Sequence, residues 1–143
     1  MPDPKRVSPA EAKALVDDGY VYVDVRSVPE FEAEHPAGAF NVPLAHLAGG
    51  GMAPNADFLS VMTAKFAKDA KLVVGCKAGG RSLKAAQALL GAGFTNVIDQ
   101  RAGFDGARDP FGGGLEAGWK GAGLPTAHGD GGDKSWATLS KKA

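Results

Sequence analysis

The chain contains one cysteine, and the residues around it have the types and spacing that activate a thiol. Cys76 follows the apolar run 72–74 and precedes a segment, 83–90, whose apolar residues recur at helical spacing. This order predicts a buried strand, a tight turn and then a helix. The turn itself is rich in glycine and carries two cations, in the order Gly75-Cys76-Lys77-Ala78-Gly79-Gly80-Arg81-Ser82.

A glycine-rich turn at the start of a helix is a setting for an anion. Its backbone N–H groups and the unpaired first N–H groups of the helix converge on one point, where a thiolate is stabilised. Lys77 and Arg81 are expected to add positive charge there. We therefore predict that Cys76 is a catalytic nucleophile. The predicted substrate-binding residues are those of the loop that follows it, namely Lys77, Ala78, Gly79, Gly80, Arg81 and Ser82.

The composition is that of one soluble domain without an obvious charged partner. The 143 residues include 16 basic and 16 acidic side chains, so the net charge of zero argues against nucleic acid or an anionic membrane as a partner. One cysteine excludes an intramolecular disulfide, and the three histidines show no metal-ligand spacing, so we expect neither a metal nor an organic cofactor. A lone reactive thiol suits a reducing compartment, so we expect the cytoplasm, or the plastid stroma if a transit peptide was removed.

Strand patterns alternate with helix patterns along the chain. Short helices are expected from the capping box Ser8-Pro9-Ala10-Glu11, over 29–34, after Asp57, and after the cysteine loop. This βαβ rhythm predicts an α/β fold with a mostly parallel sheet and helices on both faces. In such sheets, sites form beyond the carboxyl ends of strands, where Cys76 falls. The expected strands lie near 6–7 and over 21–25, 39–42, 71–75 and 96–98.

Two segments break this rhythm. Residues 102–123 contain eight glycines and predict a long flexible loop, whose part 103–114 is expected to border the mouth of the site. Residues 126–143 are predicted to form a flexible C-terminal tail, which leaves 6–125 as the folded domain.

Two other chemistries use similar loops. Gly75 to Ser82 matches the phosphate-binding pattern G-x-x-x-x-G-K-[ST] except that Arg81 stands in place of the lysine. Cysteine phosphatases need one residue more between thiolate and arginine than the four that separate Cys76 from Arg81 here. The shorter loop makes a smaller cradle, which matches a single sulfur atom on the cysteine better than a phosphate.

Sulfur transfer fits the loop best, and here the chain resembles a known family. The pattern Cys76-x-x-Gly79-x-Arg81-Ser82 resembles the active-site loop of rhodanese domains. The resemblance covers about 6–125 and is greatest to the small single-domain sulfurtransferases of plants and bacteria. An upstream motif and a closing segment also resemble the family, through Asp24-Val25-Arg26, Glu30-Phe31, His35, Gly38-Ala39, Asn41-Val42-Pro43, Gly118-Trp119 and Gly123-Leu124-Pro125.

The resemblance implies a three-layer α/β/α fold with five mostly parallel strands. It also implies a thiosulfate sulfurtransferase that moves sulfur to a thiol or cyanide through a Cys76 persulfide, with glutathione or a thioredoxin-like protein as possible acceptors. The cations Lys77 and Arg81 suit a dianionic donor such as thiosulfate. The alternative is a persulfide carrier, or a redox or interaction module, that serves a partner protein.

The remaining polar residues are expected to have structural roles. Asp24 and Arg26 are predicted to form a fold-stabilising pair, and Trp119 and Phe104 to pack in the interior. Three carboxylates are predicted to form a solvated helical face, namely Glu30, Glu32 and Glu34.

Overall fold

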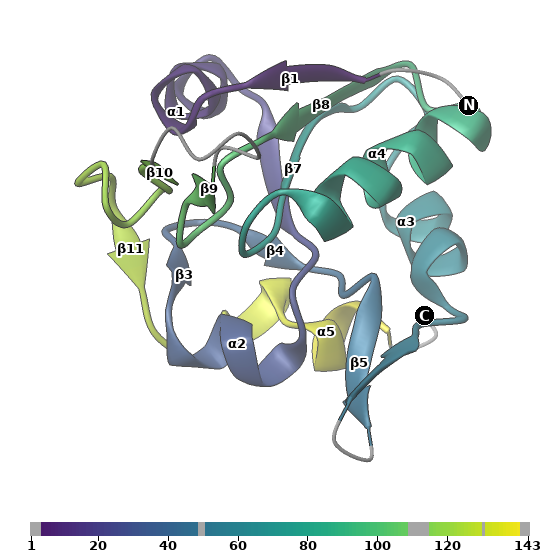
Figure 1. Cartoon of the computed structure of the whole chain (residues 1–143). Helices are drawn as coiled ribbons and strands as arrows, with labels where there is room; N and C mark the ends of the chain where they lie inside the picture. Colours follow the sequence, from purple (N-terminus) through teal and green to yellow (C-terminus); the bar gives the residue numbers. More distant parts are fainter. Residues whose placement is uncertain (1–3, 49–50, 109–114, 130, 141–143) are drawn as a thin grey trace.

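A five-stranded parallel sheet forms the centre of the molecule (Figure 1). The computed structural model describes residues 4–48, 51–108, 115–129 and 131–140. Every neighbouring pair in the sheet is parallel, which confirms the predicted α/β fold with five mostly parallel strands. In spatial order the strands are β1 (Lys5–Val7), β8 (Asn96–Gln100), β7 (Lys71–Gly75), β2 (Val21–Asp24) and β4 (Phe40–Asn41).

Helices follow the strands much as the sequence predicts. The first begins at a capping box, in which the Ser8 hydroxyl accepts from the Glu11 N–H (3.2 Å) and the Glu11 carboxylate accepts from the Ser8 N–H (2.9 Å). None of the helices in the described ranges is long and apolar enough to cross a bilayer. The helices are α1 (Pro9–Asp17), α2 (Val28–Ala33), α3 (Phe58–Lys65), α4 (Gly80–Gly91) and α5 (Trp136–Leu139).

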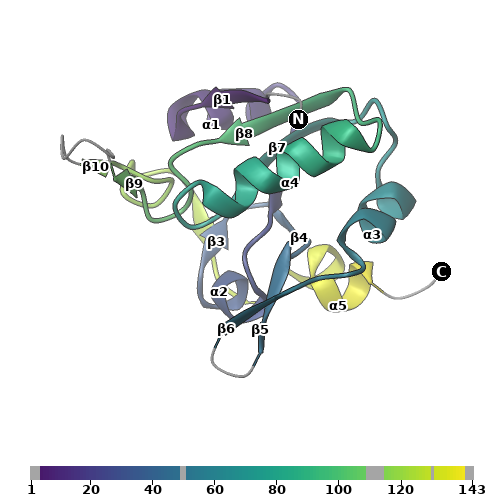
Figure 2. The ribbon, with the colours of Figure 1, turned by 45° about the vertical axis from the view of Figure 1, so that its right-hand side comes forward.

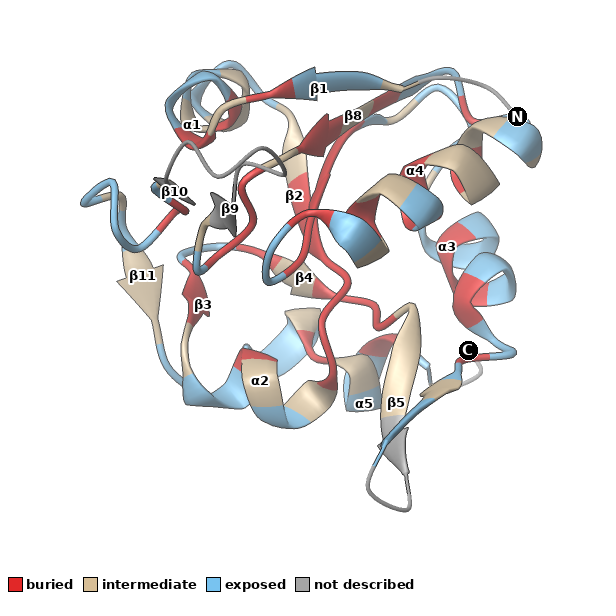
Figure 3. Ribbon diagram, in the orientation of Figure 1, coloured by how far each residue is buried: buried red, intermediate tan, exposed pale blue. Residues whose placement is uncertain are grey.

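Both faces of the sheet are buried, because successive strand residues point to opposite sides. On β7, Leu72 and Val74 pack into a cluster with residues of α3 and α4, whereas Val73 packs into a second cluster with residues of α1. Figure 2 shows α4 lying across β7 and β8, and Figure 3 shows that the strands at the centre of the sheet are almost wholly buried. The result is the expected α/β/α layering.

Three small antiparallel pairs surround the sheet, and none of them was predicted. They are β3 (His35–Pro36) with β11 (Thr126–Ala127), β5 (Ala45–Ala48) with β6 (Gly51–Pro54), and β9 (Ala107–Arg108) with β10 (Leu115–Glu116). The prediction of one long loop over 102–123 is therefore wrong where β9 and β10 pair. The part of the expected loop at 109–114 lies outside the described residues.

The expected flexible tail over 126–143 is not what the described residues form. Strand β11 pairs with β3, and a short 3₁₀ turn (Gly132–Lys134) leads into α5. Leu139 of α5 is buried in the same cluster as α3 and α4, and the Trp136 ring lies 5.6 Å from the His46 ring. Burial of these two apolar side chains orders the segment, a contribution that a polar, glycine-containing sequence does not reveal.

The turn after β8 packs directly on the cysteine loop. The Phe104 N–H donates to the Cys76 carbonyl (2.7 Å), and the Asp105 N–H donates to the Lys77 carbonyl (2.9 Å). Gly103 makes this approach possible, because its φ is +68° and a Cβ there would overlap the Lys77 carbonyl. The cysteine loop and this turn therefore fix one another.

The Gly103→Ala variant tests that contact. We expect its free energy of unfolding to fall by about 2 kcal/mol or more, because the backbone must leave a left-handed conformation or the two turns must separate. The matched control is Gly91→Ala at the exposed end of α4, where an added Cβ meets open space. That variant should be as stable as the parent or more so. Urea unfolding of both proteins measures the difference. Equal stabilities would show that the close contact at Gly103 does not contribute to folding.

Candidate active site

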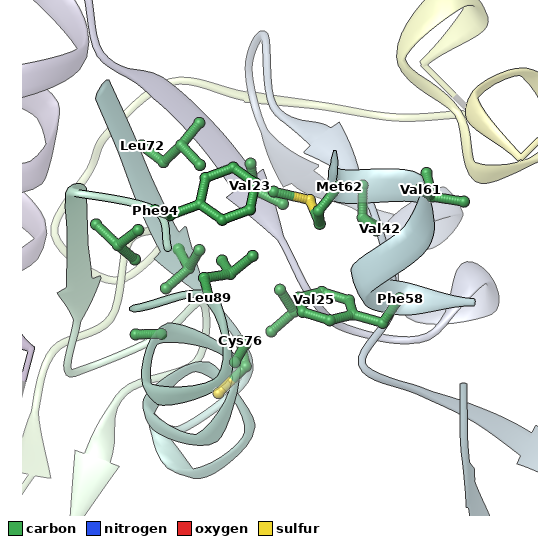
Figure 4. Packing of buried hydrophobic residues seen from close by; sticks show 14 of the residues in the cluster. Val23, Val25, Val42, Phe58, Val61, Met62, Leu72, Cys76, Leu89 and Phe94 are labelled. Atoms are coloured by element: carbon green, nitrogen blue, oxygen red, sulfur yellow. The ribbon is translucent and has the colours of Figure 1, made fainter. Parts of the chain in front are cut away.

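Cys76 lies at the carboxyl end of β7, in the turn that leads into α4. Its side chain is only 2% exposed and forms one edge of the buried cluster beneath α4. Figure 4 shows the sulfur directed away from Phe94 and Met62, which lie deeper in that cluster. The thiol therefore has an apolar side, formed by the cluster, and a polar side, formed by the loop.

The loop places one N–H donor and one hydroxyl oxygen beside the sulfur. The Gly79 N–H donates to the Cys76 Sγ (3.0 Å), and the Ser82 Oγ lies 3.5 Å from the same sulfur. Gly79 adopts a left-handed conformation (φ +101°), and a side chain there would overlap the Arg101 carbonyl. An N–H aimed at sulfur in a water-poor setting stabilises negative charge on it, so the geometry suits a thiolate or a persulfide anion.

The carbonyl of Gly79 is held as firmly as its N–H. It accepts hydrogen bonds from the Ser82 hydroxyl (3.3 Å) and from the Arg6 Nη2 (3.2 Å). Arg6 is positioned in turn by Asp99, whose Oδ2 accepts from the Arg6 Nε at 2.6 Å. Gly79, whose N–H donates to the sulfur, is thus held through its own carbonyl by side chains from β1 and α4, and Asp99 of β8 positions the first of them.

Asp99 is the most unusual member of this network. Its side chain is fully buried, and among the described residues its Oδ1 is the one buried side-chain oxygen or nitrogen without a hydrogen bond. Burial raises the pKa of Asp99, and the nearby Ser82 hydroxyl and the ion pair with Arg6 oppose that shift only in part. The sequence analysis did not single out this residue, because an aspartate within a strand pattern carries no local signal of its partner.

The sequence led us to expect Arg81 as a free cation beside the sulfur, but in the structure it has a partner. It forms a two-point ion pair with Glu30, with Nη1–Oε1 and Nη2–Oε2 distances of 2.7 and 3.1 Å. Partial burial alone would raise the pKa of Glu30. The hydrogen bonds from Arg81 and Ser27 outweigh it, however, and hold that pKa at about 2. The charge of Arg81 is therefore balanced within the site.

The prediction of a solvated face over Glu30, Glu32 and Glu34 is correct only for Glu32. Glu30 pairs with Arg81, and Glu34 accepts from the Lys120 Nζ (2.6 Å) and the Thr126 hydroxyl (2.8 Å). Positions 30 and 34 are one helical turn apart and share a face, whereas position 32 points elsewhere. The sequence does not reveal these contacts, because the partners Arg81, Lys120 and Thr126 are distant from the helix along the chain.

The other predicted loop residues lie at the surface. Lys77 is 58% exposed, with its Nζ 4.0 Å from the Asp105 carboxylate, and Ala78 and Gly80 are also exposed. Ser82, by contrast, is fully buried at the start of α4. The structure therefore brings Gly79 and Ser82 to the sulfur and leaves Lys77 at the rim.

Asp24 and Arg26 form the structural pair that the sequence predicts. Their side chains are buried and joined at 2.8 Å, and the Arg26 guanidinium stacks over the Phe104 ring at 4.5 Å. Asn41 fixes the same turn by donating to the carbonyls of both residues. Phe104 and Trp119 are buried in the second cluster, as predicted.

No histidine bonds to the sulfur in the described part of the chain. The His35 ring stacks on Phe31 and its Nδ1 lies 2.7 Å from the Phe31 carbonyl, whereas the His128 Nδ1 lies 3.0 Å from the Ala33 carbonyl. Within the described ranges, no group of three or more His, Cys, Asp or Glu side chains is arranged to hold a metal ion.

Comparison with known proteins assigns this architecture to a family. The profile of the rhodanese-like domain matches residues 8–109. The chain belongs to the rhodanese family. A solved relative, Rv0390 from M. tuberculosis, superposes with a TM-score of 0.74 at 26% identity over 90% of this chain and 100% of that one.

Two curated proteins that are similar to this rhodanese-family chain are named after an enzymatic activity. Thiosulfate sulfurtransferase 16, chloroplastic, from Arabidopsis thaliana is 39% identical over 86% of this chain and 92% of its own length. Thiosulfate sulfurtransferase GlpE from Pseudomonas fluorescens is 33% identical over 73% of this chain and 85% of its own length. The chain spans just over half the length of two further plant relatives, 55% and 56%.

The ion pair between Glu30 and Arg81 predicts a pH-dependent contribution to stability. The pKa of Glu30 falls from its ordinary value of 4.5 to about 2 on folding, so its contribution is present above pH 4.5 and is lost as the pH falls towards 2. At neutral pH the Glu30→Gln variant should therefore be less stable by about 2 kcal/mol. Its deficit relative to the parent should shrink as the pH drops through this window. Urea unfolding at several pH values measures both effects.

The matched control for this series is Glu32→Gln on the exposed face of the same helix. It removes the same charge without breaking an ion pair, so its stability should follow that of the parent at every pH. A Glu30→Gln variant that behaves like this control would show that the pair contributes nothing to folding.

Proposed function

We propose that the chain is a sulfurtransferase that works by double displacement on Cys76. The Cys76 thiolate attacks the outer sulfur of thiosulfate. A new S–S bond forms as the S–S bond of thiosulfate breaks, and sulfite leaves with the electron pair. With thiosulfate as the donor, the enzyme then carries a Cys76 persulfide anion. An acceptor thiolate attacks the outer sulfur of that persulfide, takes the sulfur, and releases the Cys76 thiolate for another cycle.

One observation carries this proposal, namely the hydrogen bond from the Gly79 N–H to the Cys76 sulfur. It comes from a residue whose carbonyl is bound by Ser82 and Arg6, so the donor residue is held in place before any reaction begins. Preorganised donors of this kind are effective where negative charge resides on the reacting atom. In the proposed cycle negative charge lies on the Cys76 Sγ in the free enzyme and on the outer sulfur in the persulfide.

Thiosulfate is the proposed donor for two reasons. The thiol is almost fully buried, which favours a small donor, and Lys77 at the rim favours a dianionic one. Glu30 neutralises Arg81, so the attraction rests on Lys77 more than the sequence suggests. The names of the Arabidopsis and Pseudomonas relatives support the same donor.

The acceptor in this proposal is a thiol or cyanide, with glutathione and a thioredoxin-like protein as the candidate thiols. The reaction needs a reducing compartment, and the plastid name of the Arabidopsis relative supports the stromal alternative to the cytoplasm. A persulfide carrier that serves one partner protein would retain the same loop. Turnover separates the two functions, since a carrier loads one sulfur from its partner and does not cycle on free thiosulfate and a small thiol.

The Cys76→Ser variant tests covalent catalysis. Because serine cannot form a persulfide, sulfur transfer should fall below detection. The mass increase of one sulfur atom, which the parent shows after treatment with thiosulfate, should also disappear. Mass spectrometry and a sulfite-release assay measure the two effects, and thermal unfolding checks that the variant is folded. Sulfur transfer by the folded variant would refute the proposed nucleophile.

The Lys77→Ala variant tests the contribution of charge to donor binding. We expect the KM for thiosulfate to rise about threefold at low ionic strength and by much less in high salt, because exposed charges are screened. Lys65→Ala, at the exposed end of α3, removes the same charge away from the loop and serves as the control. A KM that rises equally in both variants would assign the effect to net charge rather than to Lys77.

A further inference from the structure

A concave site adjoins the end of the cysteine loop, where Arg81 lines it. A cavity of about 590 Å³ lies between α3, α4 and the β5–β6 hairpin, and most of its lining is apolar. This volume is within the range of small-molecule sites in proteins, and an apolar lining with a few polar groups is their usual composition. The residues that matter here are Met52, Phe58, Leu59, Arg81, Lys84 and Ala88.

Two residues link the cavity to the surroundings of Cys76. Phe58 lines it and belongs to the same buried cluster as Cys76. Arg81, the last cation of the cysteine loop, also lines it, and Lys84 and Ala88 follow on the same face of α4 at helical spacing. A ligand lying along this face of α4 would have one end near the start of the helix, where the cysteine loop ends.

Two apolar side chains of this cavity are exposed to solvent. Met52 is 44% exposed and Leu59 is 40% exposed, and they are the only large apolar side chains in the described residues classed as exposed. Both line the same cavity, one from the hairpin and one from α3. Because both exposed apolar side chains line the same cavity, its ligand is expected to have an apolar body.

The cavity also contains one cation without a partner. Lys84 makes no ion pair or hydrogen bond with any residue in the described ranges, whereas Arg81 is already paired with Glu30. The described lining contains no carboxylate that could pair with Lys84. Its charge is therefore available to attract a negatively charged group of a ligand. The ligand therefore combines an apolar body with a single negative group.

We propose that this cavity binds the sulfur acceptor, and that the acceptor is a small thiol with an apolar chain and a carboxylate. The inference rests on the proposed function for its acceptor role, whereas the ligand class rests on the cavity alone. The apolar chain lies on Leu59 and Met52, the carboxylate pairs with Lys84, and the thiol reaches the persulfide on Cys76. This assignment favours an apolar small thiol over glutathione and over a protein thiol.

Binding is measured first, with a ligand that cannot react. Octanoate is titrated into the full-length protein and followed by isothermal calorimetry, with butyrate and octanol as the probes that lack the long chain or the charge. We expect saturable binding of octanoate and much weaker binding of the other two. Lys84→Ala and Leu59→Gln should each weaken octanoate by about fivefold, whereas the control Lys65→Ala should leave it unchanged.

Transfer is measured second, on protein loaded with one sulfur by thiosulfate. In single turnovers we expect ω-mercaptooctanoate to accept sulfur faster than glutathione, octanoate to slow that transfer, and Lys84→Ala to reduce the preference. The mass increase before the acceptor is added reports the loading step separately. A protein that loads sulfur but neither binds octanoate nor prefers ω-mercaptooctanoate overturns this inference and leaves the proposed function standing.

Two other results are equally decisive. Failure to load sulfur at all overturns the proposed function and the acceptor role together, while the octanoate titration still decides the class of ligand. Faster transfer to a thioredoxin-like protein than to ω-mercaptooctanoate, with no slowing by octanoate, would assign the acceptor to a protein and overturn the proposal.

Discussion

The geometry of the cysteine loop depends on backbone hydrogen bonds from two neighbouring strand ends. The Val25 N–H, just beyond β2, donates to the Gly75 carbonyl, and the turn after β8 donates to the carbonyls of Cys76 and Lys77. These contacts exist because β7 lies between β2 and β8 in a parallel sheet, where all three strands end at the same edge. The site is therefore a property of the sheet, and the loop sequence alone does not create it.

Charge in and around the site is organised as pairs rather than as an excess of cations. Arg81 faces Glu30, Arg26 faces Asp24, and Arg6 faces Asp99, so the three arginines bring little net positive charge. Two of them also hold backbone in place, since Arg26 and Arg6 donate to the carbonyls of Glu34 and Gly79. In the proposed cycle, the group that stabilises negative charge on sulfur is therefore the Gly79 N–H rather than a free cation, and it needs no rearrangement during reaction.

The sequence predicts the parts of this molecule that depend on local pattern. Apolar runs mark the strands of the sheet, and Ser8 with Glu11 marks the start of α1, because both signals arise within a few residues. The position of Cys76 at a strand end follows from the same reasoning.

The features that were missed depend on distant partners. Glu30 looks like a solvated residue until Arg81, from another helix, is placed beside it, and Asp99 gives no sign of its contact with Arg6. The β5–β6 hairpin is built largely from alanine, glycine and proline, which carry little strand preference, so pairing rather than propensity defines it. Helix α5 has only four residues, and the burial of Leu139 stabilises it more than its own sequence does.

The contact between the cysteine loop and the turn at Gly103 has a consequence for the order in which the protein is made. During synthesis Cys76 emerges well before Phe104 and Asp105, whose N–H groups complete the hydrogen bonding of its loop. Strand β8, which flanks β7 on one side, is also translated later. No nascent chain that ends before Asp105 contains all the hydrogen bonds of the cysteine loop, which is completed only after the last strand of the sheet and the turn beyond it have been made.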